Sequence, residues 1–339
     1  MAYKKIKIAN LLSEFAVSEN ASDNVAQNAN LRAFKVLMNA LGVSMSEAQR
    51  LIDKGRLFCN GEVVSAKNEI LRGEIELISY ENAPRGQKPI FDNQNFAVFD
   101  KQSGILSHPN GRNCAYSLCD EIWHLYGAQA GVAHRLDRET SGLILVAKDK
   151  KTQTIFKTLF EKRLVKKEYL ALVSGQTPLE FSVDLPMNSA CDEVKTRMRL
   201  CPLSEGGKEA RTEFERLCYF SEQDLLNLSR EIQLGKGFDF SKGASLLLAR
   251  PLTGRQHQIR LHLFASGFAI LGEPLYGLEK ADIERILDKQ MSAFERVSLT
   301  GATRLCLHSN RLAFEFGGKS YDILSQRDIR AEFLRALSL

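Results

Sequence analysis

The feature that most constrains this chain is a dense cluster of charge directly before an apolar run. Residues 134–142 read His-Arg-Leu-Asp-Arg-Glu-Thr-Ser-Gly, and the apolar run 143–147 follows at once. The run has the length and composition of a buried strand. Ionisable groups beside a buried strand are costly unless they pair with each other or with groups elsewhere in the fold. Taken alone, the cluster is equally typical of a surface loop held by salt bridges.

A second polar segment, far along the chain, argues against a simple surface loop. It begins with Thr253-Gly254-Arg255, follows a predicted strand at 245–249 and starts a helix that ends at Gly267. A helix start with basic and polar side chains suits a phosphate or a carboxylate. His257 and His262 are five residues apart, which is about 140° around a helix, so we expect no metal site on them.

The length of 339 residues predicts two domains with an additional segment. Residues 9–30 are rich in Asn, Ser and Ala and poor in large apolar side chains, so residues 1–30 are interpreted as an N-terminal extension. A small domain is predicted at residues 31–82. Two prolines and a glycine between residues 83 and 89 indicate a boundary, and the larger domain is predicted at 83–339.

The small domain has strong local signals. Ser44 and Glu47 have the spacing of a capping box, and Gly55 is expected to end the helix that they begin. Asn60-Gly61 between two short apolar runs predicts a hairpin, and a further strand is expected at 74–78. The order of elements predicts a small α+β domain.

In the larger domain, strand-like runs alternate with helical patterns, which predicts a mixed α/β or α+β fold. The predicted strands have compact apolar cores, at residues 96–99, 143–147, 169–173 and 246–249. A helix between two of them is indicated by apolar side chains at helical spacing, namely Ile155, Phe156, Leu159 and Phe160.

Composition limits the function classes. The net charge of +5 permits RNA binding without demonstrating it. The seven cysteines contain no C-x-x-C pair, so reduced structural thiols are expected rather than a zinc site. No apolar run approaches the ~18 residues of a membrane span, and the N-terminus lacks a signal-peptide pattern, so the expected location is the cytoplasm.

Together these segments resemble the RluA-type pseudouridine synthases. The resemblance covers residues 90–325 in the family's order. It is carried by motifs at 99–109, 134–142, 167–173, 208–214, 253–262, 271–277 and 304–308. The family resemblance implies an α+β catalytic domain with a mixed, largely antiparallel sheet. The segment 31–82 resembles the S4 RNA-binding domain, a frequent companion in the family, in which phosphate contacts would come from Arg50, Lys54, Arg56 and Lys67.

The resemblance also implies roles for single residues. Asp137 is expected to be the catalytic carboxylate, Arg260 the arginine that keeps it ionised, and Tyr169 the active-site tyrosine. A phenol is a poor base at pH 7 unless its pKa is perturbed, so stacking on the uracil is expected to matter more than base catalysis. Arg135 would support a flipped nucleotide. The other expected substrate-binding residues are His134, Arg255, Lys101 and Leu261.

There are departures from the family pattern. Gln102 replaces a usual proline, and Glu273 replaces the aspartate of a Gly-Asp turn. Residues 220–243 and 278–300 are longer than a minimal synthase needs and are interpreted as surface helices.

The predicted function is therefore isomerisation of specific uridines to pseudouridine in structured RNA, with ribosomal RNA as the first expectation. The reaction requires no cofactor or metal, and a monomer is the default. The alternatives are a tRNA synthase and an RNA-binding or ribosome assembly factor whose catalysis is dispensable. A hydrolase using Asp137 with His134 is disfavoured, because no serine or cysteine nucleophile has a recognisable setting.

Overall fold

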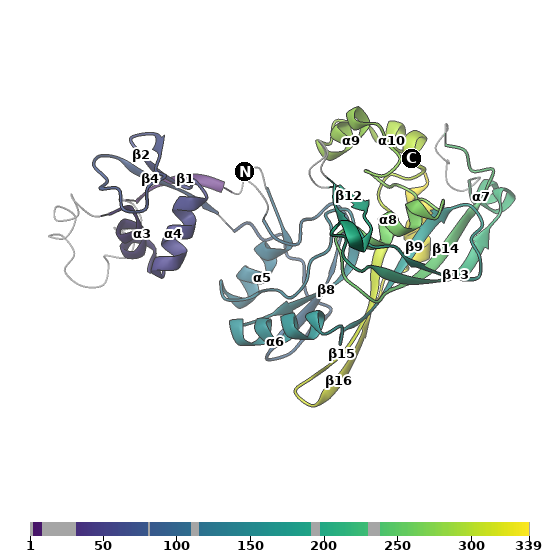
Figure 1. Cartoon of the computed structure of the whole chain (residues 1–339), viewed down its shortest axis with the longest axis horizontal. Coiled ribbons are helices and arrows are strands. Elements are labelled where there is room, and N and C mark those ends of the chain that lie inside the picture. Colours follow the sequence, from purple (N-terminus) through teal and green to yellow (C-terminus); the bar gives the residue numbers. More distant parts are fainter. Residues whose placement is uncertain are drawn as a thin grey trace. The chain divides into compact units, whose positions relative to one another are not determined.

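The computed structural model describes residues 3–8, 32–80, 82–109, 115–190, 197–229 and 238–338 (Figure 1). The chain divides into two compact units. The smaller comprises Met1–Pro84 with Pro109–Tyr116, and the larger comprises Arg85–His108 with Ser117–Leu339. No helix in the described ranges is long and apolar enough to cross a membrane.

The smaller unit packs two helices on an antiparallel sheet. The helices are α3 (Ala33–Leu41) and α4 (Met45–Asp53). The sheet has the order β1-β4-β2-β3, with β1 at Tyr3–Lys7, β2 at Leu57–Cys59, β3 at Glu62–Val63 and β4 at Ile75–Tyr80. Apolar residues from both helices and the sheet form one core.

Local signals in this unit are confirmed. Ser44 and Glu47 form the capping box of α4. Asn60 and Gly61 both have positive φ, 51° and 83°, which is the geometry of a type I′ hairpin turn between β2 and β3.

The interpretation of residues 1–30 as a separate extension is wrong for the first strand. Tyr3–Lys7 pairs with β4, and Ile8 is buried in the core of the smaller unit. Alternating lysines with Ile6 and Ile8 gives this segment one apolar edge, but its partner strand lies about 70 residues away in sequence, where periodicity cannot identify it. Residues 9–30, on which the interpretation rested, lie outside the described residues.

The larger unit is built on a sheet that is ten-stranded in its described part, with the order β10-β13-β14-β9-β15-β8-β6-β5, plus β16 on β15 and β7 on β8. Only the β15–β8 pair is parallel among these described strands. The α+β, largely antiparallel fold class is therefore confirmed. The strands are β5 (Phe91–Asp92), β6 (Phe96–Lys101), β7 (Gly131–Val132), β8 (Ser141–Ala147), β9 (Lys166–Ser174), β10 (Glu180–Asp184), β13 (Arg211–Phe220), β14 (Ala244–Pro251), β15 (Leu307–Phe316) and β16 (Lys319–Leu324).

The helices of this unit cover the sheet or flank its ends. They are α5 (Leu118–Tyr126), α6 (Lys150–Glu161), α7 (Glu222–Ser229), α8 (Gln258–Ala265), α9 (Lys280–Leu287), α10 (Ala293–Thr300) and α11 (Ile329–Ala336). A short 3-10 helix, η2 (Leu203–Glu205), and a two-stranded sheet of β11 (Met187–Ser189) and β12 (Met198–Leu200) complete the described elements.

Burial on both faces explains the apolar runs of β6 and β8. Phe96, Leu143 and Leu145 pack with Phe156 of α6, whereas Phe99 and Ile144 belong to the core formed with α5. Strands covered on both faces lose the apolar–polar alternation of a half-exposed strand. These two strands therefore form a rigid base for the charged segment that precedes β8.

Candidate active site

The backbone of the charged segment 134–140 is held by hydrogen bonds from the segment that follows β6. Ser107 Oγ donates to the Leu136 carbonyl at 2.8 Å and accepts from the Leu136 N–H at 3.1 Å. Ser103 Oγ donates to the Glu139 carbonyl at 2.6 Å, and the Gly104 N–H donates to the Arg138 carbonyl at 2.8 Å. These bonds hold Asp137 on a loop whose path is set on both sides of it.

Gly142 fixes the point where this loop enters the sheet. Its φ is 111°, and a Cβ at this position would lie 2.3 Å from the Ser309 carbonyl oxygen of β15. The register of β8 and β15 places Ser309 directly beside Gly142. Only glycine allows the two strands to approach this closely, so the loop ends at a defined place.

Arg260 joins Asp137 to a second carboxylate. Its Nη1 donates to Asp137 Oδ2 at 3.0 Å, while Nε and Nη2 donate to the two carboxylate oxygens of Glu273 at 2.8 and 2.5 Å. The side chains of Arg260 and Glu273 are 3% and 4% exposed, whereas that of Asp137 is 20% exposed. The guanidinium is therefore fixed by Glu273 and presents one edge to Asp137.

His257 provides a further neighbour of Asp137. Its Nε2 lies 3.5 Å from Asp137 Oδ2, and its Nδ1 lies 3.2 Å from the Tyr276 hydroxyl. Burial, followed by the charge of Arg260, lowers the pKa of His257 to about 4. The imidazole is therefore neutral at neutral pH.

The pKa of Asp137 lies below its usual range. Burial opposes ionisation, but His257, Arg260 and Arg135 together favour it more strongly. Because His257 is neutral at pH 7, the two arginines supply the positive charge at that pH. Asp137 is thus an ionised carboxylate in a largely buried position.

The turn before α8 is organised by Gln258. Its Oε1 accepts from Thr253 Oγ1 at 2.6 Å and from the Arg255 N–H at 3.0 Å, while its Nε2 donates to Thr212 Oγ1 at 3.0 Å. His257, the residue before the helix, has a φ of 55°. The unusual backbone of this residue and the Gln258 bonds together place the His257 side chain beside Asp137.

Tyr169 comes from β9, opposite Ala249 of β14 and Ser309 of β15. Burial raises the pKa of Tyr169 to about 12, and the charge of Asp137 acts in the same direction. The side chain is therefore a neutral phenol.

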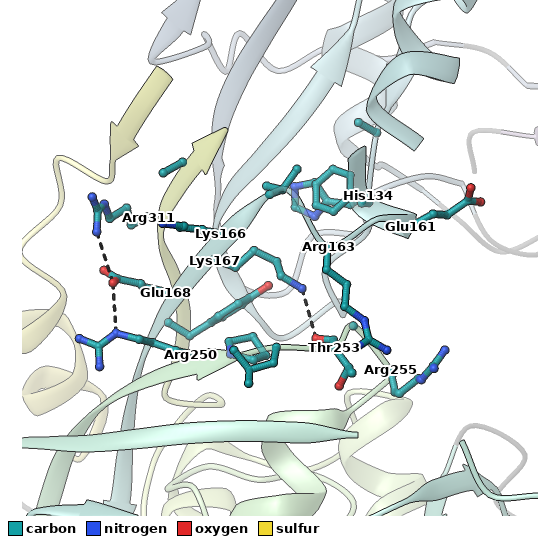
Figure 2. Close-up of a pocket in the computed structure, with 18 of the residues that line it drawn as sticks. His134, Glu161, Arg163, Lys166, Lys167, Glu168, Arg250, Thr253, Arg255 and Arg311 are labelled. Atoms are coloured by element: carbon teal, nitrogen blue, oxygen red, sulfur yellow. Dashed lines mark hydrogen bonds and ion pairs between the residues drawn. The ribbon is translucent and has the colours of Figure 1, made fainter. Parts of the chain in front are cut away.

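Asp137, Tyr169 and Arg260 converge on one cavity of about 160 Å³, which His257 also lines. A larger cavity of about 890 Å³ adjoins it, and the two share lining residues: Arg135, Lys167, Tyr169, Pro251, Thr253, Gly254 and Arg255. Figure 2 shows the larger cavity and the many cationic side chains around it.

The other predicted contacts are distributed unevenly. Arg135 is exposed and borders both cavities, as does Arg255, whose Nε donates to the Glu209 carbonyl at 3.0 Å. His134 borders the larger cavity (Figure 2), but its Nε2 accepts from the Leu145 N–H at 3.0 Å. Burial lowers the pKa of His134 to about 3, so it is a neutral ring packed at the cavity wall.

Two predicted substrate contacts are wrong. Lys101 is 0% exposed, and its Nζ donates to the carbonyls of Gln102, Ile105 and Arg138 at 3.0, 2.7 and 3.1 Å. The turn after β6 folds over the Lys101 ammonium. Lys101 therefore holds the Asp137 loop through the Arg138 carbonyl and cannot reach a phosphate.

Leu261 is 6% exposed and packs in an apolar cluster with Leu275 and Tyr276. It does not border the Asp137 cavity. Its position on α8 points it into the protein, on a different side of the helix from Arg260.

The interpretation of 278–300 as surface helices is incomplete. The segment does form α9 and α10, but Arg296 of α10 reaches inward. Its Nη2 lies 2.7 Å from Glu139 Oε2 and donates to the Gly272 carbonyl at 3.1 Å. One side chain therefore connects the Asp137 loop to the turn that carries Glu273. In the other long segment, α7 is described, and residues 230–237 lie outside the described part.

Sequence reasoning missed three residues of the site. From the sequence, His257 is weighed only as a metal ligand and Glu273 only as a departure from a pattern. Lys167 belongs to a motif and to a basic stretch, 148–167, that could contact RNA but whose lysines are each expected to be solvated. His257 and His262 do face different partners, since His262 Nδ1 lies 3.0 Å from Thr212 Oγ1. Proximity in sequence to Arg260 is the available signal for His257, whereas the basic stretch does not distinguish Lys167 from its exposed neighbours.

Comparison with known proteins gives consistent matches. The model of the RNA pseudouridylate synthase family matches residues 95–265, and that of the S4 domain matches residues 31–75. An uncharacterized RNA pseudouridine synthase of Helicobacter pylori is 35% identical over 311 residues, covering 91% of this chain and 94% of the relative.

Two further relatives differ in the RNA that their names state. The ribosomal large subunit pseudouridine synthase D of Nitrosomonas europaea is 32% identical, covering 58% of this chain and 51% of its own length. The mitochondrial tRNA pseudouridine(32) synthase of Saccharomyces cerevisiae is 31% identical, and the match covers 67% of this chain and 46% of that relative. The solved structure of human RNA pseudouridylate synthase domain containing 1 has a TM-score of 0.52 at 20% identity, covering 71% of this chain and 83% of that one, and supports the fold.

Proposed function

Because the chain belongs to the RNA pseudouridylate synthase family and carries an S4 domain, we propose that it isomerises specific uridines in structured ribosomal RNA, with Asp137 as the catalytic carboxylate. The observation that carries this proposal is the placement of an ionised, largely buried Asp137 3.0 Å from Arg260, in a cavity that Tyr169 also lines. A carboxylate in such a site can act where a solvated one is unreactive.

The chemistry is an isomerisation in which the N1–C1′ bond of uridine breaks and a C5–C1′ bond forms. N1 ends with a proton and C5 loses one, so no net redox change occurs. Asp137 acts at the sugar–base junction, at ribose C1′ or at uracil C6. Arg260 keeps it ionised, and Tyr169 stacks on the uracil. The charge and burial of Asp137 and Tyr169 support these proposed roles.

A uridine stacked in a helix cannot reach a carboxylate inside a cavity, so the target nucleotide is flipped out of its stack. Arg135 is exposed at the rim of both cavities, where it can support the flipped nucleotide or occupy the vacated position. Flipping costs a few kcal/mol, which contacts to the RNA backbone must offset.

The first test is Asp137→Asn. We expect pseudouridine formation to be lost, with the fold and RNA affinity nearly unchanged. Pseudouridines would be mapped in RNA from cells that carry the gene, lack it or carry the variant. Asp184→Asn is a matched control, because Asp184 is an exposed carboxylate on β10. Unchanged pseudouridine at every site after gene deletion would contradict the enzymatic proposal.

The same mapping distinguishes ribosomal RNA from tRNA as the substrate, since the site that disappears identifies the RNA. If no pseudouridine site disappears but ribosome assembly is impaired, the result would favour the alternative of an assembly factor. We further propose that the protein acts as a monomer in the cytoplasm, which size-exclusion chromatography and fractionation would check.

The S4 unit is proposed to supply RNA affinity and not chemistry. Removal of residues 1–82 should weaken RNA binding more than it slows conversion of bound RNA in a single turnover. Equal losses in both would count against a separate binding module.

A further inference from the structure

Lys167 is a largely buried cation that lacks a carboxylate partner. Its Nζ donates to the Thr253 carbonyl at 3.2 Å (Figure 2). Across the described residues, none of the ion pairs includes Lys167. Burial alone lowers the pKa of Lys167, to about 8, and no neighbouring carboxylate raises it.

Two arginines in the same cavity wall, Arg250 and Arg311, are neutralised by carboxylates. Arg250 Nε and Arg311 Nη1 each lie 3.3 Å from Glu168 Oε1, and both links are drawn in Figure 2. Arg250 also pairs with Glu215 at 2.9 Å, and Arg311 also pairs with Asp322 at 2.6 Å. Lys167, adjacent to Glu168 in sequence, does not take part in this network.

A buried ammonium is costly unless a negative group compensates for the water it has lost. One carbonyl oxygen satisfies one of its three donors. An anionic ligand that enters the cavity would satisfy the remaining donors and offset the cost of burial. The position of Lys167 determines which anion this is.

Lys167 lines both the Asp137 cavity and the larger cavity beside it. A Cβ on Gly254 would lie 3.4 Å from Lys167 Nζ, so the glycine leaves the approach to the ammonium open. Because the two cavities share this wall, the backbone of a nucleotide whose base occupies the Asp137 cavity can pass along it. We propose that Lys167 binds a phosphodiester group of the RNA backbone next to the target uridine.

This inference rests on the proposed function, because it takes the base in the smaller cavity to be uracil. It adds an anchor at the junction of the two cavities. Phosphate contacts fix position and register without reading sequence, so Lys167 would hold the nucleotide while Asp137 reacts. The expected effect is on binding of the RNA and much less on the chemical step.

The test measures the affinity of the full-length protein for an oligouridylate of eight nucleotides, by fluorescence anisotropy over a series of KCl concentrations. Each phosphate contact to a single strand contributes about 0.7 to the slope of log affinity against log salt. Lys167→Met should lower that slope by about 0.7 and weaken binding by about 10-fold at 0.1 M salt. Lys167→Arg should retain most of both, since it keeps the charge.

Lys157→Met is the matched control. Lys157 lines the same cavity, but its side chain is 74% exposed and lies 3.8 Å from Glu161. Its loss should change the slope and the affinity much less. On RNA from cells that lack the gene, Lys167→Met should raise KM by about the same factor as it weakens oligouridylate binding, with kcat within about twofold.

A wild-type salt slope for Lys167→Met, or equal effects from Lys157→Met, would overturn the inference. A fall in kcat with unchanged KM and salt slope would do so as well, because it would assign Lys167 to holding the Thr253 turn. If the wild-type chain forms no pseudouridine but Lys167→Met still loses the phosphate contact, the proposed function fails and the assignment of Lys167 stands.

Discussion

Replacement of Glu273 by glutamine tests how the site keeps Asp137 in place. Glu273 accepts two hydrogen bonds from Arg260, at 2.8 and 2.5 Å, and two from backbone N–H groups, of Leu275 at 2.9 Å and of Tyr276 at 3.4 Å. Glutamine has the same shape, but its amide turns one acceptor into a donor that faces the guanidinium. Arg260 would keep its single bond to Asp137 and lose its bidentate partner.

The size of the effect follows from burial. Both partners of the Arg260–Glu273 pair are at most 4% exposed, and breaking a buried pair costs about 3–5 kcal/mol. Asp137 still compensates part of the charge of Arg260, so we expect the free energy of unfolding to fall by about 3 kcal/mol, the lower end of this range. A guanidinium that shifts by about 1 Å would also misplace Asp137, for which a fall in kcat of about 100-fold is expected.

Urea unfolding followed by tryptophan fluorescence measures the stability of the larger unit, which contains Glu273. The chain has one tryptophan, Trp123, and it lies on α5 of the larger unit. Glu284→Gln is the control, since Glu284 is 60% exposed and its pair with Lys280 spans 4.0 Å. It should unfold like the wild type. A Glu273→Gln midpoint equal to that of the control would refute the reasoning about the buried pair, and a normal kcat with lowered stability would refute the orienting role.

Three further predictions follow from the same contacts. Oligouridylate affinity should be constant up to about pH 8 and fall above it, as Lys167 loses its proton while His134 stays neutral, and Lys167→Arg should remove this decline in anisotropy titrations. Burial lowers the pKa of Lys101 to about 7, so between pH 7 and 10 this residue should bind fewer protons in the folded than in the unfolded chain. The free energy of unfolding should therefore rise with pH over this window, by up to about 1.4 kcal/mol per pH unit. Urea unfolding of Lys101→Met should not show this rise. Arg296→Gln should lower the single-turnover rate by about 10-fold with unchanged RNA affinity, because it releases Glu139; a rate equal to the wild type would exclude a positioning role for α10.

Local backbone preferences explain which elements the sequence could predict. The hairpin at Asn60-Gly61 and the capping box at Ser44 depend on neighbours within a few residues, and both are present. The apolar runs of β6 and β8 are buried on both faces and are continuous for that reason. These features require no knowledge of the distant partners.

Long-range contacts explain the failures. Whether Lys101 points to solvent or inward depends on the turn after β6 and on the Arg138 carbonyl, 37 residues away. The pairing of Tyr3–Lys7 with β4 likewise depends on a strand far along the chain. The convergence of Asp137 with Arg260 is equally long-range, and it could be anticipated only because the motifs that carry them resemble a family.

The interactions of Asp137 also bear on which group accepts the C5 proton. Both polar contacts fall on Oδ2, and within the described residues Oδ1 accepts no hydrogen bond, so one oxygen is held and the other is free to face a ligand. Tyr169, with its pKa raised to about 12 by burial, is not present as the phenolate at neutral pH. The pKa values of His257 and Asp137 are both lowered, so basicity does not distinguish these two groups. We propose that Asp137 takes the proton once the glycosidic bond has broken, because its Oδ1 is free to face a ligand, whereas His257 Nε2 faces Asp137 Oδ2. In this proposal Tyr169 stacks on the ring. Tyr169→Phe should in that case retain most of the activity, whereas a loss as complete as that of Asp137→Asn would return the proton transfer to the phenol.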